Sequence, residues 1–561
     1  MADDRPQLST GPAEDLSGFL EALGRANVAA LRLIEAITAD MRLRLGGTKP
    51  GREDRTRHQD RLHGLSWFAT YAATLAQTEA HLRRLAADGR AGEIDHLAAV
   101  LGCGNYLAQM AGGIAMSQTE FARLREYDID PDLLADFARA AEPIIRGGHD
   151  VGRKQNFAAL LAHGQFPEDG LDETLSLVRE TFRRVADRYR DAAQDWHQAD
   201  RLIPLAVIDE LSQMGVFGLT LPESHGGAGM GKQAMCVVSE ELSRGYIGLG
   251  SLGTRAEIAA ELIHGSGTRE QQARFLPGLA SGAILPTAVF TEPEAGSDLA
   301  SLRTRAVRDG DVYRVSGAKT WITHAARADL MTMLVRTGAP DSGHGGLSIL
   351  LAEKPRGSEN DPFPAPGMSG SEIKVLGYRG MKEYELAFDN FEVPARNLLG
   401  DVEGEGFRQL MKTFESARIQ TAARALGVAR AAFELALDYA MVRHQFGRPI
   451  LDFPRVHGKI AAMASEIMMV RCLCYHAASA KDGGRRSDLE AGMAKLLAAR
   501  LAWSAADNAV QIHGGNGYAL EYPISRILVD ARILNIFEGA AEIQADVIAS
   551  RLLAGEADGR A

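Results

Sequence analysis

The chain has 561 residues, of which 46% are hydrophobic and 24% are charged. This length predicts about three to five domains, and the composition excludes an intrinsically disordered chain, a collagen-like chain and a small disulfide scaffold. The net charge of −11 is spread along the sequence, so a nucleic-acid-binding surface has no support. The four cysteines fit a reducing compartment and lack the paired spacing of a zinc site, so no metal site is predicted.

The N-terminal sequence MADDRPQLST is acidic and lacks the apolar core of a signal peptide, which predicts a cytoplasmic location. Residues 97–116 carry no charge and are long enough to span a membrane. Their apolar content is mostly Ala and Gly, however, so a buried helix is predicted there and no membrane association is expected.

Residues 1–165 are predicted to form a helical unit of their own. Apolar residues recur at helical spacing from Leu16 to Met41, and the pair Gly46–Gly47 marks a stop. Further helical patterns cover about 60–86, 93–126 and 131–146. The sequence GQFPEDGLDE at 164–173 concentrates Gly, Pro and acidic residues, which predicts a domain boundary.

The rest of the chain is predicted to contain three units in the order helical, β-rich and helical. Residues 171–285 are helical; residues 286–398 contain an alternating segment and short apolar runs; residues 399–555 are helical, with runs at about 407–443, 455–481, 487–512 and 535–553. This order differs from the alternation of a doubly wound nucleotide-binding fold. The predicted fold class is mainly α with a central β domain.

Two polar strings lie at the start of the β-rich unit, and each permits a functional and a purely structural interpretation. In FTEPEAGSD, residues 290–298, Gly296 and Ser297 expose backbone N–H groups that could hold a phosphate or a ring carbonyl, although an ordinary turn has the same composition. In GAKTWIT, residues 317–323, strand geometry places Trp321 and Thr323 on one face. That pair suits a planar heterocycle, or a cross-strand packing contact.

Three further strings lie at predicted helix ends. RHQFGRPI, residues 443–450, offers cations for phosphates or a positively charged helix cap. QIHGGNGY, residues 511–518, forms a glycine-rich bend that permits close approach to the backbone. In NIFEGAAEIQ, residues 535–544, Glu538 follows an apolar run, which predicts a desolvated carboxylate with a raised pKa suited to a general base, or an ordinary acid at a helix N-terminus.

Together and in this order, the five strings resemble those of the acyl-CoA dehydrogenase family, over about residues 171–553. The resemblance implies a fold made of an N-terminal helical domain, a middle β-barrel-like domain and a C-terminal four-helix domain. It also implies FAD as the cofactor, an acyl-CoA substrate and a homo-oligomer of two or four subunits with the flavin between them. The electron acceptor would be electron-transferring flavoprotein.

The resemblance assigns roles to individual residues. Glu538 matches the catalytic base that removes the α-proton while the β-hydrogen leaves as hydride to flavin N5. Ala417 occupies the position at which other branches of the family carry their glutamate, which leaves Glu538 as the candidate. The residues assigned to FAD are Phe290, Thr291, Gly296, Ser297, Trp321, Ile322, Thr323, Arg443, Gln445, Phe446, Phe453, Gln511, Gly514, Gly515, Ala540 and Glu542.

The substrate residues implied by the resemblance are Ser297, Glu415, Arg418 and Gly539. The additional N-terminal unit and Ala540, at a position where threonine is usual, are similar to a branch that oxidises a short branched dicarboxylic acyl-CoA. A buried substrate carboxylate requires a cation, and Arg255 is the candidate, with a surface salt bridge as the alternative role. Tyr378 and Arg379 are weaker candidates.

Three other functions share these motifs. Another short-chain, branched or glutaryl-type acyl-CoA dehydrogenase would carry the same strings, and so would an acyl-CoA oxidase that uses O2. A non-catalytic flavoprotein or assembly factor is disfavoured because Glu538 is present. The role of residues 1–165 is left open between a cover for the active-site entrance, an extended dimer interface and a solvent-facing unit.

Overall fold

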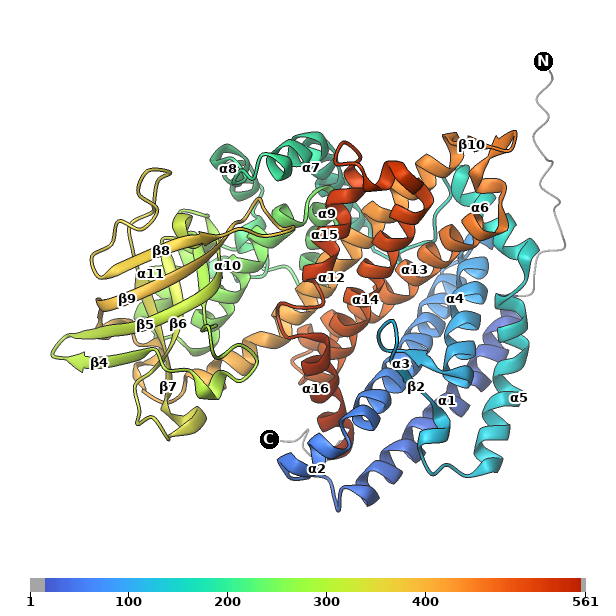
Figure 1. Ribbon diagram of the computed structural model, residues 1–561, viewed down its shortest axis with the longest axis horizontal. Coiled ribbons are helices and arrows are strands. Elements are labelled where there is room, and N and C mark those ends of the chain that lie inside the picture. Colours follow the sequence, from blue (N-terminus) through green and yellow to red (C-terminus); the bar gives the residue numbers. More distant parts are fainter. Residues whose placement is uncertain (1–15, 556–561) are drawn as a thin grey trace.

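A computed structural model describes residues 16–555 of the protein (Figure 1). Residues 1–10, on which the prediction of a cytoplasmic location rests, lie outside the described part. The central sheet lies at one end of the molecule, the C-terminal helices lie in the middle, and the N-terminal helices lie at the other end (Figure 1). This arrangement confirms the predicted fold class, mainly α with a central β domain and an extra helical unit.

The N-terminal extension, residues 16–165, is helical as predicted. One prediction was wrong in its length, because the helix expected at 93–126 ends at Gly112. Gly113 has a φ of 134°, and a short hairpin follows it. The apolar periodicity continues past Gly112 and therefore did not show this end. The elements are α1 (Leu16–Arg44), α2 (Arg52–Arg57), α3 (Gln59–Ala87), α4 (Glu93–Gly112), β1 (Ile114–Ala115), β2 (Phe121–Ala122), α5 (Pro131–Gly148) and α6 (Val151–Ala162).

A second set of helices follows the linker at 163–172. Asp172 caps the first of them by accepting a hydrogen bond from the Leu175 N–H. The helix α10 is almost entirely buried and includes the polar residues Ser251, Thr254 and Arg255, so it brings polar groups into the interior. The helices are α7 (Glu173–Gln198), α8 (Leu205–Gln213), α9 (Lys232–Gly245), α10 (Ile247–Ser266) and α11 (Arg269–Ala280).

Seven strands form the central sheet in the order β3-β6-β4-β5-β9-β8, with β7 paired to β6. The long strands β5 and β9 are antiparallel, and their register places Thr323 opposite Glu383. The register shifts between Lys319 and Ile322, and Trp321 there has a φ of 58°. The strands are β3 (Pro286–Val289), β4 (Arg305–Asp309), β5 (Val312–Thr323), β6 (Leu330–Arg336), β7 (Leu347–Glu353), β8 (Met368–Ile373) and β9 (Glu383–Pro394).

The C-terminal helices form the centre of the molecule. The run predicted at 535–553 is helical only from Ala541, because Glu538 and Gly539 adopt left-handed φ values of 54° and 86°. The helix α13 is long and apolar enough to cross a membrane, but 78% of its most apolar window is buried, as in a core helix. The elements are α12 (Gly406–Val442), β10 (His444–Gln445), β11 (Arg448–Pro449), α13 (Pro454–Asp482), α14 (Asp488–His513), α15 (Pro523–Ile533) and α16 (Ala541–Ala554).

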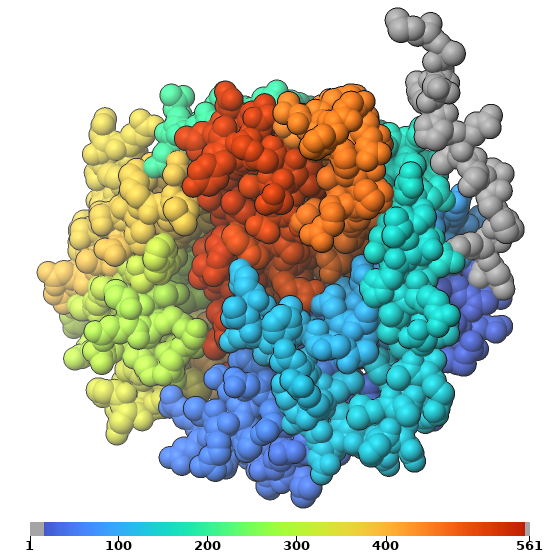
Figure 2. Space-filling view, turned by 45° about the vertical axis from the view of Figure 1, so that its right-hand side comes forward, coloured from blue at the N-terminus to red at the C-terminus, as the bar shows by residue number. Residues whose placement is uncertain are grey.

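The extension packs directly against the C-terminal helices. In Figure 2 the blue and cyan surface of the extension meets the orange and red surface of the C-terminal helices. The helix α3 contacts α13, α14 and α16, and α4 and α6 contact α13. Apolar residues of both parts belong to one continuous core, including Leu65 and Phe68 of α3 and Met469 of α13. The extension is therefore an integral part of the folded molecule.

Candidate active site

Glu538 lies in a tight turn between α15 and α16. Its side chain is 11% exposed, and Arg255 Nη2 lies 2.5 Å from its Oε1 atom. A non-glycine residue with a φ of 54° stores roughly 1–3 kcal/mol of backbone strain. Two buried side chains hold this turn, since Lys495 donates to the Gly539 carbonyl at 2.6 Å and Gln544 donates to the carbonyls of Glu538 and Gly539, each at 3.2 Å.

A second arginine lies beside the same carboxylate. Arg424 of α12 is fully buried, and its Nη2 atom is 3.7 Å from Glu538 Oε1. It donates to Ser251 Oγ at 3.0 Å, and its guanidinium lies 4.9 Å from the centre of the Phe537 ring. The Nε atoms of Arg255 and Arg424 are buried and have no hydrogen-bond partner among the described residues. The site therefore holds spare cationic donors next to a carboxylate.

These two arginines overturn the predicted pKa shift of Glu538. Burial acts to raise the pKa of this carboxyl, as expected, but Arg255, Arg424 and Lys495 favour the ionised form and together hold the pKa of Glu538 below its ordinary value. The pattern around Glu538 could not show this, because Arg255 is 283 residues away in the sequence. The carboxylate is thus ionised but electrostatically restrained.

A second buried carboxylate, Glu383, lies near the first. Thr323 donates its hydroxyl to the two Glu383 oxygens at 2.8 and 3.1 Å. Burial raises the pKa of Glu383 to about 7, against the opposing effects of the Thr323 hydrogen bond and of Arg255. Thr323 is buried, whereas Trp321 is 55% exposed. The regular alternation behind the same-face prediction for these two residues is interrupted at Trp321.

The predicted residues at the start of the middle domain lie close to Trp321 in the fold. The Thr320 N–H donates to the Thr291 carbonyl at 3.0 Å, which ties the 290–298 segment to β5. Phe290 is buried against Phe414 of α12, with ring centres 6.4 Å apart. Gly296 and Ser297 are exposed, and Ile322 is buried in the core of the sheet. The exposed Trp321 indole and the exposed Gly296–Ser297 pair thus lie on two segments that this hydrogen bond ties together.

The two residues predicted to contact CoA lie on α12, between Phe414 and Arg424. Glu415 accepts hydrogen bonds from Lys481 Nζ at 3.1 Å and Ser487 Oγ at 3.0 Å. Burial lowers the pKa of Arg418, and its guanidinium lies 5.9 Å from the Phe414 ring centre. Ala417 is buried between them. Arg418 is therefore the cation available on this segment.

The other predicted cofactor residues form a separate group. This distal group contains Arg443, Gln445, Phe446, Phe453, Gln511, Gly514 and Gly515. It lies at the far ends of α12 and α14, which are joined by a hydrogen bond from Asn516 to Tyr439 at 3.0 Å. Arg424 and Val442 lie on one continuous helix, so about 27 Å separates them along its axis. Ala540 and Glu542 instead flank the start of α16, next to Glu538. One chain therefore does not bring all the predicted cofactor residues together.

The weaker substrate candidates differ in position. Tyr378 is buried, its hydroxyl contacts Ser251 Oγ, and its ring lies edge-on to Phe537 at 5.7 Å. Arg379 instead donates to the carbonyls of Val375 and His197. Among residues 16–555 there is no group of three or more His, Cys, Asp or Glu side chains that could hold a metal ion.

Sequence reasoning missed four polar residues of this site, namely Ser251, Glu383, Arg424 and Lys495. The missed cations share one signal, because each is an isolated charge in an apolar helical segment, in AARALG and in GMAKLL. Isolated buried charges are costly unless they are paired, so such positions indicate a site. Glu383 had no comparable signal, because it starts a strand of alternating polarity.

Comparison with known proteins shows that the chain belongs to the acyl-CoA dehydrogenase family. Family models match all three parts: "Acyl-CoA dehydrogenase, N-terminal domain" over residues 172–283, "middle domain" over 287–391 and "C-terminal domain" over 404–553. The chain is 57% identical to (2S)-methylsuccinyl-CoA dehydrogenase of Cereibacter sphaeroides, over 96% of this chain and 97% of that protein. A match of this extent includes the N-terminal extension.

Three further relatives each match about two thirds of the chain. An acyl-CoA dehydrogenase of Bacillus subtilis is 39% identical over 68% of this chain and 98% of its own length. Butyryl-CoA dehydrogenase of Megasphaera elsdenii superposes with a TM-score of 0.63 at 31% identity, over 67% of this chain and 97% of that one. A glutaryl-CoA dehydrogenase in complex with glutaryl-CoA gives 0.64 at 32% identity, over 68% and 95%. The extension therefore distinguishes this chain from these relatives.

Proposed function

We propose that this protein oxidises (2S)-methylsuccinyl-CoA to mesaconyl-CoA, a reaction of the ethylmalonyl-CoA pathway, with FAD as cofactor and Glu538 as the base. The observation that carries this proposal is the pair Arg255 and Arg424 beside Glu538, each with a buried Nε–H that lacks a partner among the described residues. A dicarboxylic acyl chain brings a carboxylate that such donors accept. The 57% identical relative with the printed name methylsuccinyl-CoA dehydrogenase supports the same choice.

A purely aliphatic acyl chain fits these residues less well. It would bury its apolar end against two guanidinium groups and leave their spare donors unsatisfied, which costs about 1–3 kcal/mol for each unmade hydrogen bond. A carboxylate at the end of the acyl chain removes that cost. Selectivity for a dicarboxylic substrate then follows from the charge of Arg255 and Arg424 rather than from the size of the pocket.

The residues present fit FAD in two places. The exposed Trp321 indole and the exposed Gly296–Ser297 backbone suit a planar ring and its polar edge, with the Thr323 hydroxyl nearby. In this proposal Phe290, Thr291, Ile322, Ala540 and Glu542 complete that part of the site. Bound FAD would supply the acceptor for the hydride that leaves the β-carbon of the substrate.

The distal group supports a cofactor site shared between two copies of the chain. Arg443, Gln445 and Phe446 are exposed and lie beyond Val442, which is about 27 Å from Arg424 along α12, so they suit the cofactor of a neighbouring subunit rather than of their own. Gln511, Gly514 and Gly515 are exposed at the same end. We therefore propose a homo-oligomer, dimer or tetramer, and light scattering on the full-length protein distinguishes these two.

The chain's own residues account for removal of the α-proton. In the structure, Arg255 restrains the Glu538 carboxylate through a direct ion pair. A substrate carboxylate that binds Arg255 takes over part of this charge, so the pKa of Glu538 rises when the substrate is in place. Glu538 then accepts the α-proton, and its backbone N–H is a donor for the enolate oxygen that develops on the thioester. Ser297, Glu415, Arg418 and Gly539 are proposed to hold the CoA thioester.

We propose the cytoplasm as the location of this protein. The proposed electron acceptor is electron-transferring flavoprotein. A solved structure described as electron transferring flavoprotein of Acidaminococcus fermentans contains a chain that is 33% identical to this one, with a TM-score of 0.64 over 67% of this chain and 97% of that chain. This likeness supports a link between the fold and that acceptor. The proposal is tested directly by measuring whether purified electron-transferring flavoprotein is reduced when the protein turns over its substrate.

The substrate is tested by a panel of thioesters with an artificial electron acceptor and analysis of the products. We expect turnover of methylsuccinyl-CoA to be roughly 10- to 150-fold faster, in kcat/KM, than that of butyryl- or isobutyryl-CoA, because one charged hydrogen bond is worth about 1.5–3 kcal/mol. Preference for glutaryl-CoA would make the protein a glutaryl-type dehydrogenase instead. Stoichiometric peroxide without an added acceptor would make it an oxidase.

A further inference from the structure

The extension contacts both helices that hold the turn around Glu538. Lys495, which donates to the Gly539 carbonyl, belongs to α14, and Gln544, which donates to the carbonyls of Glu538 and Gly539, belongs to α16. Both side chains are fully buried. A Cβ atom at Gly539 would collide with Gln544 Nε2, so the turn and this side chain fit closely. Any displacement of α14 or α16 therefore displaces the Glu538 carboxylate.

The extension binds α16 through polar contacts along one side. Ser66 of α3 donates to the Ala545 carbonyl at 2.6 Å, and His63 Nε2 lies 3.1 Å from Asp546 Oδ1. Arg55 of α2 donates to Ser550 Oγ at 2.6 Å, and Arg42 of α1 donates to the carbonyls of Leu552 and Leu553 at 3.0 and 2.9 Å. Ala545 directly follows Gln544, so these contacts begin next to the side chain that holds the turn.

The helix α3 of the extension also contacts α14. Arg500 of α14 donates to the Tyr71 hydroxyl at 2.6 Å, and its guanidinium lies 4.9 Å from the Trp67 ring centre and 5.2 Å from that of Tyr71. Tyr71 stacks on Tyr106 of α4 with ring centres 4.2 Å apart. Lys495 and Arg500 lie on one helix, about 7.5 Å apart along its axis. The extension therefore reaches both helices that support the turn.

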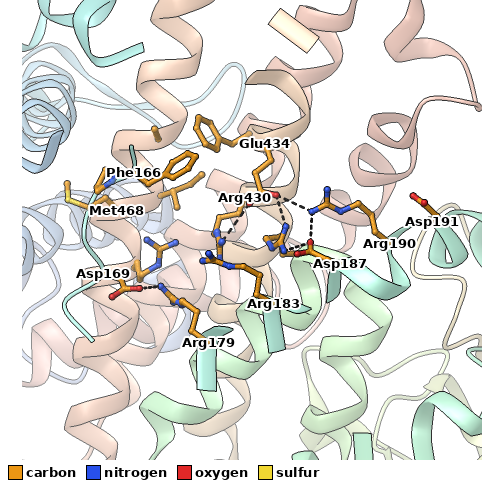
Figure 3. Close-up of a pocket in the computed structure, with 16 residues that line it drawn as sticks. Phe166, Asp169, Arg179, Arg183, Asp187, Arg190, Asp191, Arg430, Glu434 and Met468 are labelled. Carbon is orange, nitrogen blue, oxygen red and sulfur yellow. Dashed lines mark hydrogen bonds and ion pairs between the residues drawn. The ribbon is translucent and has the colours of Figure 1, made fainter. Parts of the chain in front are cut away.

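The opposite end of the extension is fixed independently. Glu168 of the linker accepts from Arg90 at 2.8 Å, and Asp169 pairs with Arg179 of α7, as Figure 3 shows. A pocket of about 680 Å³, shown in Figure 3, is lined by six arginines, namely Arg179, Arg183, Arg190, Arg244, Arg430 and Arg471. Each of them has a carboxylate partner. The cluster is thus an ion-pair network that anchors the linker, and we assign it no ligand.

We propose that the N-terminal extension positions the catalytic base. Its contacts with α14 and α16 hold these two helices in place, and the helices in turn keep Lys495 and Gln544 on the turn and Glu538 in its left-handed conformation. Ser66, His63, Arg55 and Arg500 are positioning residues, since they act on Glu538 only through these helices. The inference rests on the proposed function, in which Glu538 removes the α-proton. It assigns to the extension a role in the reaction that covers neither the active-site entrance nor a subunit interface.

The test compares three variants of the full-length holoenzyme. The first is the triple variant Arg55→Ala, His63→Leu, Ser66→Ala, which removes the contacts to α16. The second restores one contact, with His63→Gln in place of His63→Leu, because a glutamine amide can still donate to Asp546. The third is the control Arg139→Ala, Arg146→Ala, which removes two ion pairs from the exposed side of α5, where the arginine side chains are 73% and 79% exposed. Each is measured for kcat, KM, flavin content and amide hydrogen exchange of residues 536–548.

We expect the triple variant to lose about tenfold in kcat with little change in KM, because misplacing a base affects the transition state more than ground-state binding. Exchange of residues 536–548 should accelerate in this variant, the variant with His63→Gln should recover part of the loss, and the control should match the wild type. The inference is overturned if kcat of the triple variant stays within about twofold of wild type, or if the control loses as much.

The variant Glu538→Gln is assayed in parallel to separate this inference from the proposed function. If Glu538→Gln keeps full turnover, the assignment of Glu538 as the base fails. If Glu538→Gln is inactive and the triple variant is unaffected, only the role of the extension is refuted.

Discussion

Arg255 and Glu538 form a direct ion pair in the interior, with Arg255 Nη2 2.5 Å from Glu538 Oε1. The pair joins the proposed partner of the substrate carboxylate to the proposed base. One guanidinium can therefore control both which acyl chain is accepted and how basic Glu538 is. This coupling explains how a site with two buried arginines can still perform proton abstraction, because the substrate itself supplies the charge that frees the base.

Replacing Arg255 should change substrate selectivity. In Arg255→Met we expect kcat/KM for methylsuccinyl-CoA to fall about a hundredfold, because a charged hydrogen bond of about 1.5–3 kcal/mol is lost. The value for butyryl-CoA should change far less. The ratio of the two kcat/KM values is the measurement, and Arg308→Met on the exposed strand β4 is the matched control. An equal fall for both substrates would assign Arg255 a purely structural role.

The same substitution should move the pH dependence of the reaction. In the free enzyme, Arg255 and Arg424 hold the pKa of Glu538 below its ordinary value against the effect of burial. Without Arg255 the effect of burial gains weight, so the pKa of Glu538 rises and the acid limb of kcat/KM shifts to higher pH, since that limb reports the free enzyme. The profile is recorded with butyryl-CoA, which makes no demand on Arg255. A limb that stays in place or moves to lower pH would contradict the ion pair as the controlling interaction.

Glu383 should make the folded protein less stable as the pH rises. Burial raises its folded pKa to about 7, from an ordinary value of 4.5. Between these two values the folded state binds more protons than the unfolded chain, so this contribution to the free energy of unfolding is present below about pH 4.5 and is lost as the pH rises through about 7. In Glu383→Gln, which keeps an acceptor for the Thr323 hydroxyl, that loss should vanish. We expect a gain on the order of 2 kcal/mol at about pH 8 and little gain at about pH 5, measured by urea unfolding.

Phe446 should be required for assembly and for cofactor retention together. Its side chain is 93% exposed in the single chain, beside Arg443 and Gln445. In the proposed oligomer a carboxylate placed there would be buried at the subunit interface, so Phe446→Glu should yield a monomer that retains about tenfold less flavin per chain. Light scattering and flavin absorbance measure the two effects on one sample. A monomeric variant that keeps its full flavin content would show that a single chain completes the site.

The five polar strings of the sequence predicted the position of Glu538, and the change from helical to alternating patterns predicted the order of the domains, because both depend on local patterns. The left-handed turn at Glu538 agrees with the glycine that follows it. The charges around Glu538 were harder to predict from the sequence. Arg255 was expected to bind a substrate carboxylate, but its contact with Glu538 joins segments 283 residues apart, and Arg424 and Lys495 gave only the signal of isolated charges in apolar helices. The prediction of a raised pKa for Glu538 was therefore wrong. The apolar run before Glu538 indicated its burial, but nothing in the local sequence indicated the cations that lower its pKa.

The contacts of the extension with α14 and α16 could not be predicted from its sequence either. Ser66, His63 and Arg55 are ordinary polar residues in their helical patterns, and nothing local indicates that they bind α16 at the opposite end of the chain. Only the packing of α3 against α14 and α16 shows this relationship. Long-range contacts of this kind determine the environment of a site without leaving a pattern in the residues that make them.

The most direct test of the central claim is anaerobic titration of the purified flavoprotein with methylsuccinyl-CoA, in the wild type and in Glu538→Gln. The account predicts that the wild-type flavin absorbance bleaches completely, while the variant, which binds substrate but lacks the base, bleaches at least about a thousandfold more slowly. Rapid bleaching of Glu538→Gln, or a wild type that bleaches with butyryl-CoA and not with methylsuccinyl-CoA, would contradict it.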